Sequence, residues 1–209
     1  MKPIVIVNLK TYNQGKKVID LVRKISKVDK GVILGVQSVD LSEVVKVVKN
    51  PVYVQHVDFE EVGRNTGFVL PEAVKSRGAE GVFLNHSEHK LSFGVLKKSV
   101  ERCREVKLKT AVFAGSLSEA KKIKKLKPDY LIIEPPKLVA GNVSVSEAKP
   151  ELIERISKRL GYDFIVGAGI KSNNDLVIAM KLGAKGIAVS SAITKAKNPE
   201  KILREMISR

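Results

Sequence analysis

Cysteine is almost absent from this 209-residue chain, which contains one cysteine, Cys103, and no tryptophan. A single cysteine cannot form an internal disulfide or a cysteine-rich metal site, and such sparing use is typical of a reducing compartment. Cys103 lies in a helical pattern, ERCREV, without a histidine beside it. We therefore interpret it as a structural thiol. The sequence predicts a cytoplasmic protein without a metal centre.

Long apolar runs are also missing. No apolar stretch approaches the roughly 18 residues that a membrane-spanning helix needs. The apolar stretch near the start, residues 4–7, is too short for the apolar region of a signal peptide, so we interpret it as a first strand. No linker rich in Pro, Gly or Ser separates two halves. We therefore expect one domain over residues 1–209 and no membrane association.

Acidic residues are outnumbered, since 22 Asp and Glu stand against 38 Lys and Arg, for a formal net charge of +16. This balance raises the question of nucleic-acid binding. However, the lysines of KKIKKLK (121–127) alternate with Ile123 and Leu126 at helical spacing, as on a solvated helix face. No tryptophan is available to stack on bases. We therefore expect no nucleic-acid partner, and a positive field would equally speed the capture of a small anion.

The chain does contain a repeated unit, in which short β-branched runs alternate with stretches that have apolar residues at i, i+3 and i+4. The eight runs lie at residues 4–7, 32–36, 52–55, 82–84, 110–113, 130–133, 164–166 and 187–189. Strands that are apolar on both faces and separated by helices form parallel sheets. Eight such units predict an α/β protein of the (β/α)8 class, a TIM barrel. The alternative is an open doubly wound sheet, which has fewer strands and a Gly-rich first turn, whereas here that turn reads NLKTY.

Helix ends carry chemical signals. Ser116 and Ser172 are each followed three positions later by an acidic residue, as in a capping box, and Asn198 precedes a proline. Three glycines follow helical patterns, where a residue with left-handed backbone often ends a helix: Gly78, Gly161 and Gly183.

In a barrel of this class the active site lies at the carboxyl ends of the strands. The polar or small residues found there are Asn8, Lys10, Gln55, His56, Asn85, His86, Ser87, Glu88, Glu134, Gly167, Gly169, Ser190 and Ser191. A carboxylate, an imidazole and an ammonium group at one mouth can remove a proton beside a carbonyl and stabilise the resulting charge. The small residues after the last two predicted strands leave backbone N–H groups accessible to a phosphate.

Other interpretations of these residues remain open. Glu134, which ends the apolar run YLII and precedes two prolines, could be a surface carboxylate paired with a lysine. We interpret His56 as a structural or interface residue and expect His89 to be exposed.

Six segments carry a resemblance to a known family. They are VNLKTY, NHSE, EPP, VSVSEAKPE, GAGI and TKAKNPE, in this order across essentially the whole chain. Together they resemble triosephosphate isomerase in its short, archaeal-type form. The resemblance implies an isomerase of glycolysis and gluconeogenesis that interconverts dihydroxyacetone phosphate and glyceraldehyde 3-phosphate. Proton transfer would pass through an enediolate, without a metal or an organic cofactor.

The resemblance also implies residue roles. Glu134 would be the base, His86 the neutral electrophile, Lys10 the electrostatic stabiliser of enediolate and phosphate, and Asn8 a substrate hydrogen-bonding group. Glu88 would be the charge partner of the lysine. The backbone of four residues would bind the phosphate: Val139, Gly169, Ser190 and Ser191. Residues 135–142 would form a mobile lid, whose tip, Ala140-Gly141-Asn142, differs from the Gly-Thr-Gly of many short-form members.

The segment 58–68 is long enough to project from the barrel. The resemblance implies that it inserts into a neighbouring subunit near Lys10, so we expect a homodimer or a homotetramer. Two other functions remain as alternatives. One is another phosphate-binding barrel isomerase or lyase, and the other is a non-catalytic binding protein that uses the basic surface.

Overall fold

Eight parallel strands form a closed barrel in which each strand pairs with the next and β8 pairs with β1. The computed structural model describes residues 2–135 and 150–208. The strands are β1 (Ile4–Asn8), β2 (Ile33–Val36), β3 (Val52–Val54), β4 (Gly81–Leu84), β5 (Lys109–Ala114), β6 (Tyr130–Ile133), β7 (Ile165–Val166) and β8 (Gly186–Val189). The predicted (β/α)8 architecture is confirmed, and each predicted strand is present within two residues of its expected bounds.

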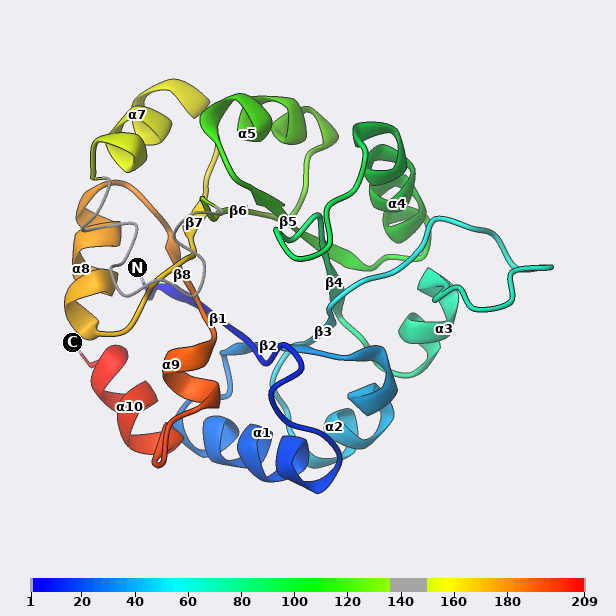
Figure 1. Ribbon diagram of the computed structural model, residues 1–209, viewed down its shortest axis with the longest axis horizontal. Coiled ribbons are helices and arrows are strands. Elements are labelled where there is room, and N and C mark those ends of the chain that lie inside the picture. The colour runs from blue at the N-terminus through cyan, green and yellow to red at the C-terminus, as the bar shows by residue number, and fades with distance from the viewer. Residues whose placement is uncertain (1, 136–149, 209) are drawn as a thin grey trace.

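Helices form a ring around the barrel (Figure 1). The α-helices are α1 (Lys16–Val28), α2 (Leu41–Val47), α3 (Pro71–Ser76), α4 (Phe93–Glu105), α5 (Leu117–Ile123), α7 (Pro150–Leu160), α8 (Asn173–Lys181), α9 (Ser191–Thr194) and α10 (Pro199–Met206), and the 3-10 helices are η1 (Ser38–Asp40) and η2 (Lys124–Leu126). The short helix α9, directly after β8, is an addition to the basic repeat that the apolar pattern did not predict.

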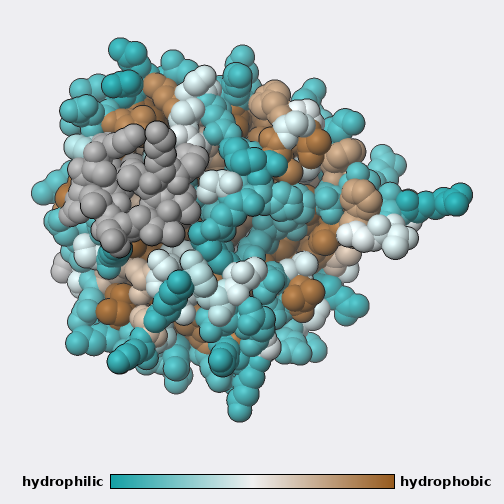
Figure 2. All heavy atoms as spheres, in the orientation of Figure 1, coloured by the Kyte–Doolittle hydropathy of each residue, from teal (hydrophilic) through white to brown (hydrophobic). Residues whose placement is uncertain are grey.

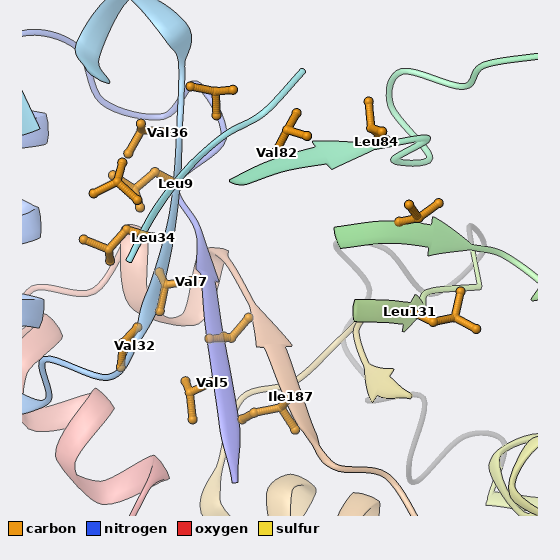
Figure 3. Close-up of a cluster of buried hydrophobic side chains, with 14 of the residues drawn as sticks. Val5, Val7, Leu9, Val32, Leu34, Val36, Val82, Leu84, Leu131 and Ile187 are labelled. Atoms are coloured by element: carbon orange, nitrogen blue, oxygen red, sulfur yellow. The ribbon is translucent and has the colours of Figure 1, made fainter. Parts of the chain in front are cut away.

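Alternation along each strand divides the apolar side chains into two layers. In β1, Val5 and Val7 belong to the large cluster that packs between the strands and the helices, part of which Figure 3 shows. Ile6, between them, belongs to a second cluster, to which each of the eight strands contributes at least one residue, among them Tyr53 and Phe83. Successive strand residues point to opposite faces, so this second cluster fills the barrel interior.

Close packing inside the barrel requires small residues at particular points. A Cβ atom at Gly35 in β2 would lie 2.0 Å from a ring carbon of Phe83, and one at Gly186 would lie 1.9 Å from the carbonyl oxygen of Ile4. No side chain tolerates such distances. These glycines therefore allow the aromatic interior layer and the β1–β8 closure to form.

The helix-end predictions are largely confirmed. Ser172 forms a complete capping box with Asp175, and Asn198 accepts a hydrogen bond from the backbone N–H of Lys201. The side chain of Ser116 accepts a hydrogen bond from the backbone N–H of Glu119 and caps α5. The carboxylate of Glu119, however, accepts from the backbone N–H of Gly115 and not from that of Ser116, and the predicted capping box is therefore incomplete. The backbone is left-handed at all three predicted glycines, with φ of 93°, 58° and 99° at Gly78, Gly161 and Gly183.

The segment between β3 and α3 projects from the ring of helices (Figure 1). It carries two exposed apolar side chains, Val62 and Phe68. On the face shown in Figure 2, hydrophobic residues form small patches separated by hydrophilic ones.

Several further features bear on the sequence predictions. Cys103 is buried and unpaired, and burial raises the pKa of its thiol to about 12, as expected for a structural cysteine. In the described part of the chain no helix combines the length and apolarity needed to cross a membrane, and no three His, Cys, Asp or Glu side chains cluster as metal ligands would. Val139, nearly all of the predicted lid and its tip at residues 140–142 lie outside the described residues.

Candidate active site

Glu134 and His86 meet at the carboxyl ends of their strands. The backbone N–H of Glu134 donates to the carbonyl of Ala114, so the first residue after β6 still pairs with β5. Glu134 Oε2 lies 2.9 Å from His86 Nε2, and both side chains are about nine-tenths buried, at 10% and 9% exposure. Gly167 leaves room for the carboxylate, since a Cβ atom there would lie 3.1 Å from Glu134 Oε1. Barrel closure thus brings together residues that are 48 positions apart.

Despite this short distance, the two atoms are not hydrogen-bonded. Glu134 Oε2 and His86 Nε2 both lack a hydrogen-bond partner among the described residues, although both atoms are buried. Buried polar atoms without partners are rare in folded proteins, because each costs about 1–3 kcal/mol. The two atoms face each other at the barrel mouth and make no further contact that would occupy them, so both are available to a ligand.

Contacts of the ring define the tautomer of His86. Its Nδ1 accepts a hydrogen bond from the backbone N–H of Glu88 at 3.1 Å. A ring nitrogen that accepts cannot carry a proton, so in this arrangement the proton of the neutral ring is on Nε2. The ring also packs edge-on against Phe113, with centroids 4.8 Å apart. His86 can therefore act as a neutral hydrogen-bond donor beside Glu134.

Lys10 lies at the same mouth in an unusual backbone conformation. Its φ is 49°, in the left-handed region that non-glycine residues seldom adopt. Two hydrogen bonds hold it there, since its N–H donates to Asn8 Oδ1 at 3.0 Å and its carbonyl accepts from Gln55 Nε2 at 3.0 Å. The ammonium group is 2.7 Å from Glu88 Oε1. The ammonium group is thus held at a defined position. Gln55, a strand-end residue for which no role was predicted, helps to hold the backbone of Lys10.

Small residues after β7 and β8 form a second part of the site. Ala168 and Gly169 are consecutive left-handed residues, with φ of 74° and 71°. Ser190 occupies the N-cap position of α9 without a capping hydrogen bond from its side chain, and the first backbone N–H groups of a helix have no partner within it. Its hydroxyl oxygen is buried and lacks a hydrogen-bond partner among the described residues. Helix N-termini and turns of exposed backbone N–H groups attract anions.

Two neighbouring cavities open at this mouth and share Asn8 and Lys10. The lining of the first, about 40 Å³, includes Asn8, Lys10, Glu134, Gly169, Ser190 and Ser191, which are all of the predicted catalytic and phosphate-binding residues within the described chain except His86. His86 lines the second, about 280 Å³, together with Gln55 and His56. The structure therefore gathers the predicted residues in one place.

Two residues beside this site, Asn85 and Glu119, have a part in positioning it that was not predicted from the sequence. Asn85, just before His86, has φ of 62° and donates from Nδ2 to Glu119 at 2.8 Å. Glu119 also pairs with Lys90. Burial would raise the pKa of Glu119, but hydrogen bonds from Lys90, Gly115 and Asn85 outweigh it and lower that pKa. A sequence signal existed only for Asn85, because asparagine is common at left-handed positions.

The two remaining histidines lie beside the site. His56 Nε2 is 3.2 Å from Asp58, and its ring stacks on that of His89 with centroids 4.2 Å apart. Burial lowers the pKa of His56 more than Asp58 raises it. His89 is exposed, as predicted. Both histidines line the same cavity as His86, but neither forms a hydrogen bond or an ion pair with Glu134.

Comparison with known proteins agrees with this geometry. The family model described as triosephosphate isomerase matches residues 3–206. The chain belongs to the triosephosphate isomerase family. It is 36% identical to triosephosphate isomerase of Methanocaldococcus jannaschii, over 98% of each chain. It is 39% identical to the enzyme of Sulfurisphaera tokodaii, covering 98% of this chain and 94% of the relative.

A likeness to solved structures supports the fold. The crystal structure of triosephosphate isomerase from Bartonella henselae aligns with a TM-score of 0.74 at 17% identity, covering 97% of this chain and 98% of that one. The family assignment makes the chain an isomerase and agrees with the resemblance of the six sequence segments.

Proposed function

We propose that this chain interconverts dihydroxyacetone phosphate and glyceraldehyde 3-phosphate in glycolysis and gluconeogenesis. The observation that carries the proposal is the buried contact between Glu134 Oε2 and His86 Nε2, which lie 2.9 Å apart at the barrel mouth without a hydrogen bond to any other described residue. A carboxylate can accept a proton and a neutral imidazole N–H can donate a hydrogen bond, so the pair suits proton transfer beside a carbonyl.

In this mechanism Glu134 removes a proton from C1 of dihydroxyacetone phosphate. The C–H electron pair forms the C1–C2 double bond, and the carbonyl π electrons move to the oxygen on C2. The resulting enediolate is protonated at C2 by the carboxylic acid of Glu134, and a proton moves from the oxygen on C1 to the oxygen on C2. Atoms and electrons balance within substrate and protein groups, so the reaction consumes no co-reactant.

His86 and Lys10 stabilise the negative charge on the enediolate oxygens. The proton on His86 Nε2 is available because Nδ1 is occupied by the backbone N–H of Glu88. Lys10 supplies a positive charge whose position is held by its contacts with Asn8, Gln55 and Glu88. Groups that are already oriented need no reorganisation during the reaction, which is the main source of electrostatic catalysis. Asn8 donates or accepts hydrogen bonds at the same substrate.

The phosphate binds at the ends of β7 and β8. The left-handed turn at Gly169 and the N-terminus of α9 at Ser190 and Ser191 supply backbone N–H groups. The buried, unpartnered hydroxyl of Ser190 supports this placement. Val139 remains a predicted fourth contributor, together with the predicted lid, whose closure would exclude water from the enediolate.

The variant Glu134→Asp tests the mechanism. Shortening the base by one methylene withdraws the carboxylate from the substrate carbon, and we expect kcat to fall by about a hundredfold or more. The matched control is Glu154→Asp, since Glu154 is a half-exposed residue of α7 that pairs with Lys158. Steady-state assay with glyceraldehyde 3-phosphate measures both variants, and thermal unfolding verifies their folds. Equal kcat in the two variants would refute the role of Glu134.

We also propose that the enzyme is a cytoplasmic homodimer or homotetramer. The buried single cysteine supports the reducing compartment. The projecting segment 58–68 supports self-association, because its exposed Val62 and Phe68 offer apolar contacts. Light scattering coupled to size exclusion measures the mass in solution. Replacing both apolar residues with Ser should lower that mass to one chain, and an unchanged mass would place the interface elsewhere.

A further inference from the structure

A third cavity, of about 280 Å³, lies away from the active site. Its lining includes Lys109, the first residue of β5, and Asp129, which immediately precedes β6. It therefore opens at the amino ends of these strands, on the face of the barrel opposite the active site. The residues around it come also from the C-terminal ends of α4 and η2, and α4 and α5 are neighbours in the ring of helices (Figure 1).

Positive charge dominates this cavity. Four cationic residues line it, Arg104, Lys107, Lys109 and Lys127, against one acidic residue, Asp129. The Oδ2 atom of that carboxylate already accepts hydrogen bonds from the backbone N–H and hydroxyl of Thr110, at 2.8 and 3.3 Å.

None of the four cations forms an ion pair with a residue in the described ranges, whereas Arg102, also in the last turn of α4, pairs with Glu72 and Glu105. The cavity thus gathers cations without neutralising them. Arg104 is nevertheless held in place, because one of its N–H groups donates to the carbonyl of Leu126 at 2.7 Å and ties the end of α4 to the end of η2.

The backbone supplies an independent observation. Lys107 follows α4 with φ of 59°, and Lys127 follows η2 with φ of 52°. Where the chain turns left-handed after α3, α7 and α8, the residue is glycine in each case. A residue with a Cβ atom costs about 1 kcal/mol or more in this conformation. The two helix ends that carry lysine in place of glycine are thus the two that border this cavity.

Stabilisation of helix ends does not account for this choice. Cations near a helix C-terminus interact favourably with the helix dipole. However, α4 already has Arg102 and Arg104 in its last turn, and α5 has Lys121 and Lys122. Glycine at the left-handed position would remove the backbone strain and leave these charges in place.

We propose that this cavity is a binding site for a small multivalent phosphate anion, of the class represented by inorganic pyrophosphate. Four unneutralised cations match the charge of such an anion, and Lys and Arg are the residues that bind phosphate groups most strongly. The volume is below the usual range for drug-sized ligands, roughly 300–1,000 Å³, which favours a compact anion. The site shares no residue with the two cavities of the active site.

Calorimetric titration with inorganic pyrophosphate tests the proposal. The full-length protein is first saturated with glycerol 3-phosphate, which lacks the carbonyl and occupies the active site without reacting. We expect the wild-type chain to bind one pyrophosphate per chain under these conditions. In the double variant Lys107→Gly with Lys127→Gly, the affinity for pyrophosphate should fall by about tenfold or more, because two charge-assisted contacts are lost.

The control variant is Lys30→Gly with Lys49→Gly. These two exposed lysines lie outside the cavity, form no ion pair or hydrogen bond with a described residue, and stand at ordinary φ. The control removes the same charge and should keep wild-type affinity within about twofold, because distant surface charges are screened by salt. Equal weakening in both double variants would show a diffuse positive field and overturn the proposal, as would the absence of pyrophosphate binding in the wild type.

Thermal unfolding separates binding from folding. Without pyrophosphate, the variant at Lys107 and Lys127 should unfold at a higher temperature than the wild type, because glycine relieves two left-handed residues. Weaker binding by a more stable protein cannot be attributed to damage to the fold. Wild-type affinity in this variant would overturn the proposal.

Discussion

Asn85 donates a hydrogen bond of 2.8 Å to Glu119, and this contact joins the end of β4 to the first turn of α5. The same amide group donates to the carbonyl of Phe113 at 2.8 Å, and the second oxygen of Glu119 accepts from the backbone N–H of Gly115 at 2.7 Å. The residue that follows Asn85 is His86. The position of the imidazole therefore depends on a carboxylate that does not itself reach the site.

From this relationship we predict that Glu119→Ala lowers both stability and turnover. The loss of the bonds to Asn85 and Gly115 should reduce the free energy of unfolding by about 1–3 kcal/mol. Without the carboxylate, His86 is less firmly positioned, so kcat should fall while KM changes little. Urea unfolding and steady-state kinetics measure the two effects, with Glu101→Ala, an exposed residue of α4, as the control. A stability loss with unchanged kcat would make Glu119 purely structural.

A second prediction concerns Gln55, whose amide nitrogen donates to the carbonyls of Lys10 and Gly35 at 3.0 and 3.2 Å. Leucine has a similar size but no donor, so Gln55→Leu should release the left-handed backbone at Lys10. We expect kcat/KM to fall by about tenfold or more because the ammonium group loses its defined position. Gln14→Leu, which removes a local bond to the carbonyl of Thr11, is the control and should keep its activity. Equal kinetics for the two variants would contradict the prediction.

The pH dependence of stability should carry a contribution from His56. Burial lowers the pKa of its imidazole in the folded chain, whereas in the unfolded chain the pKa is about 6.5. Below that pH the unfolded chain binds more protons than the folded chain, so the free energy of unfolding decreases as the pH falls.

Urea unfolding of the wild type and of His56→Gln, at several values between about pH 5 and 8, measures this contribution. The variant should show a shallower decrease below about pH 6.5, since glutamine does not titrate. Identical slopes in the two proteins would show that His56 makes no contribution. The nearby acids Asp58 and Glu60 act in the opposite direction, since each raises the pKa of His56.

The interior layer of the barrel gives a prediction on stability alone. In Gly35→Ala the new Cβ atom would meet the ring of Phe83, 2.0 Å away in the present structure. The ring must move, which should cost about 1–3 kcal/mol in the free energy of unfolding. Gly94→Ala is the matched control, because a Cβ atom there meets no atom within 4 Å and the residue lies in the first turn of α4. This variant should be as stable as the wild type or more stable by up to about 1 kcal/mol.

The sequence was sufficient to predict the barrel because strand and helix periodicity are local properties of a chain. The apolar runs also predicted where the strands end, including the end of YLII before Glu134. Because parallel strands bring their carboxyl ends to one face, Glu134 could be placed on the face of the active site. The capping box at Ser172 and the left-handed glycine at Gly183 followed from the same local chemistry. The residue roles and the phosphate contact of Val139 came from resemblance, and they remain proposals.

The tertiary structure alone determined how side chains from distant segments meet. The proton position on His86 depends on a backbone N–H two residues later, and the left-handed backbone at Lys10 depends on Gln55, which directly follows β3. The basic cavity on the opposite face forms because α4 and η2 end beside each other, although Lys107 and Lys127 are 20 positions apart. Sequence patterns indicate whether a residue lies on the buried or the exposed face of its helix or strand. Distances between segments are decided only when the eighth strand pairs with the first and every helix is packed into its place around the barrel.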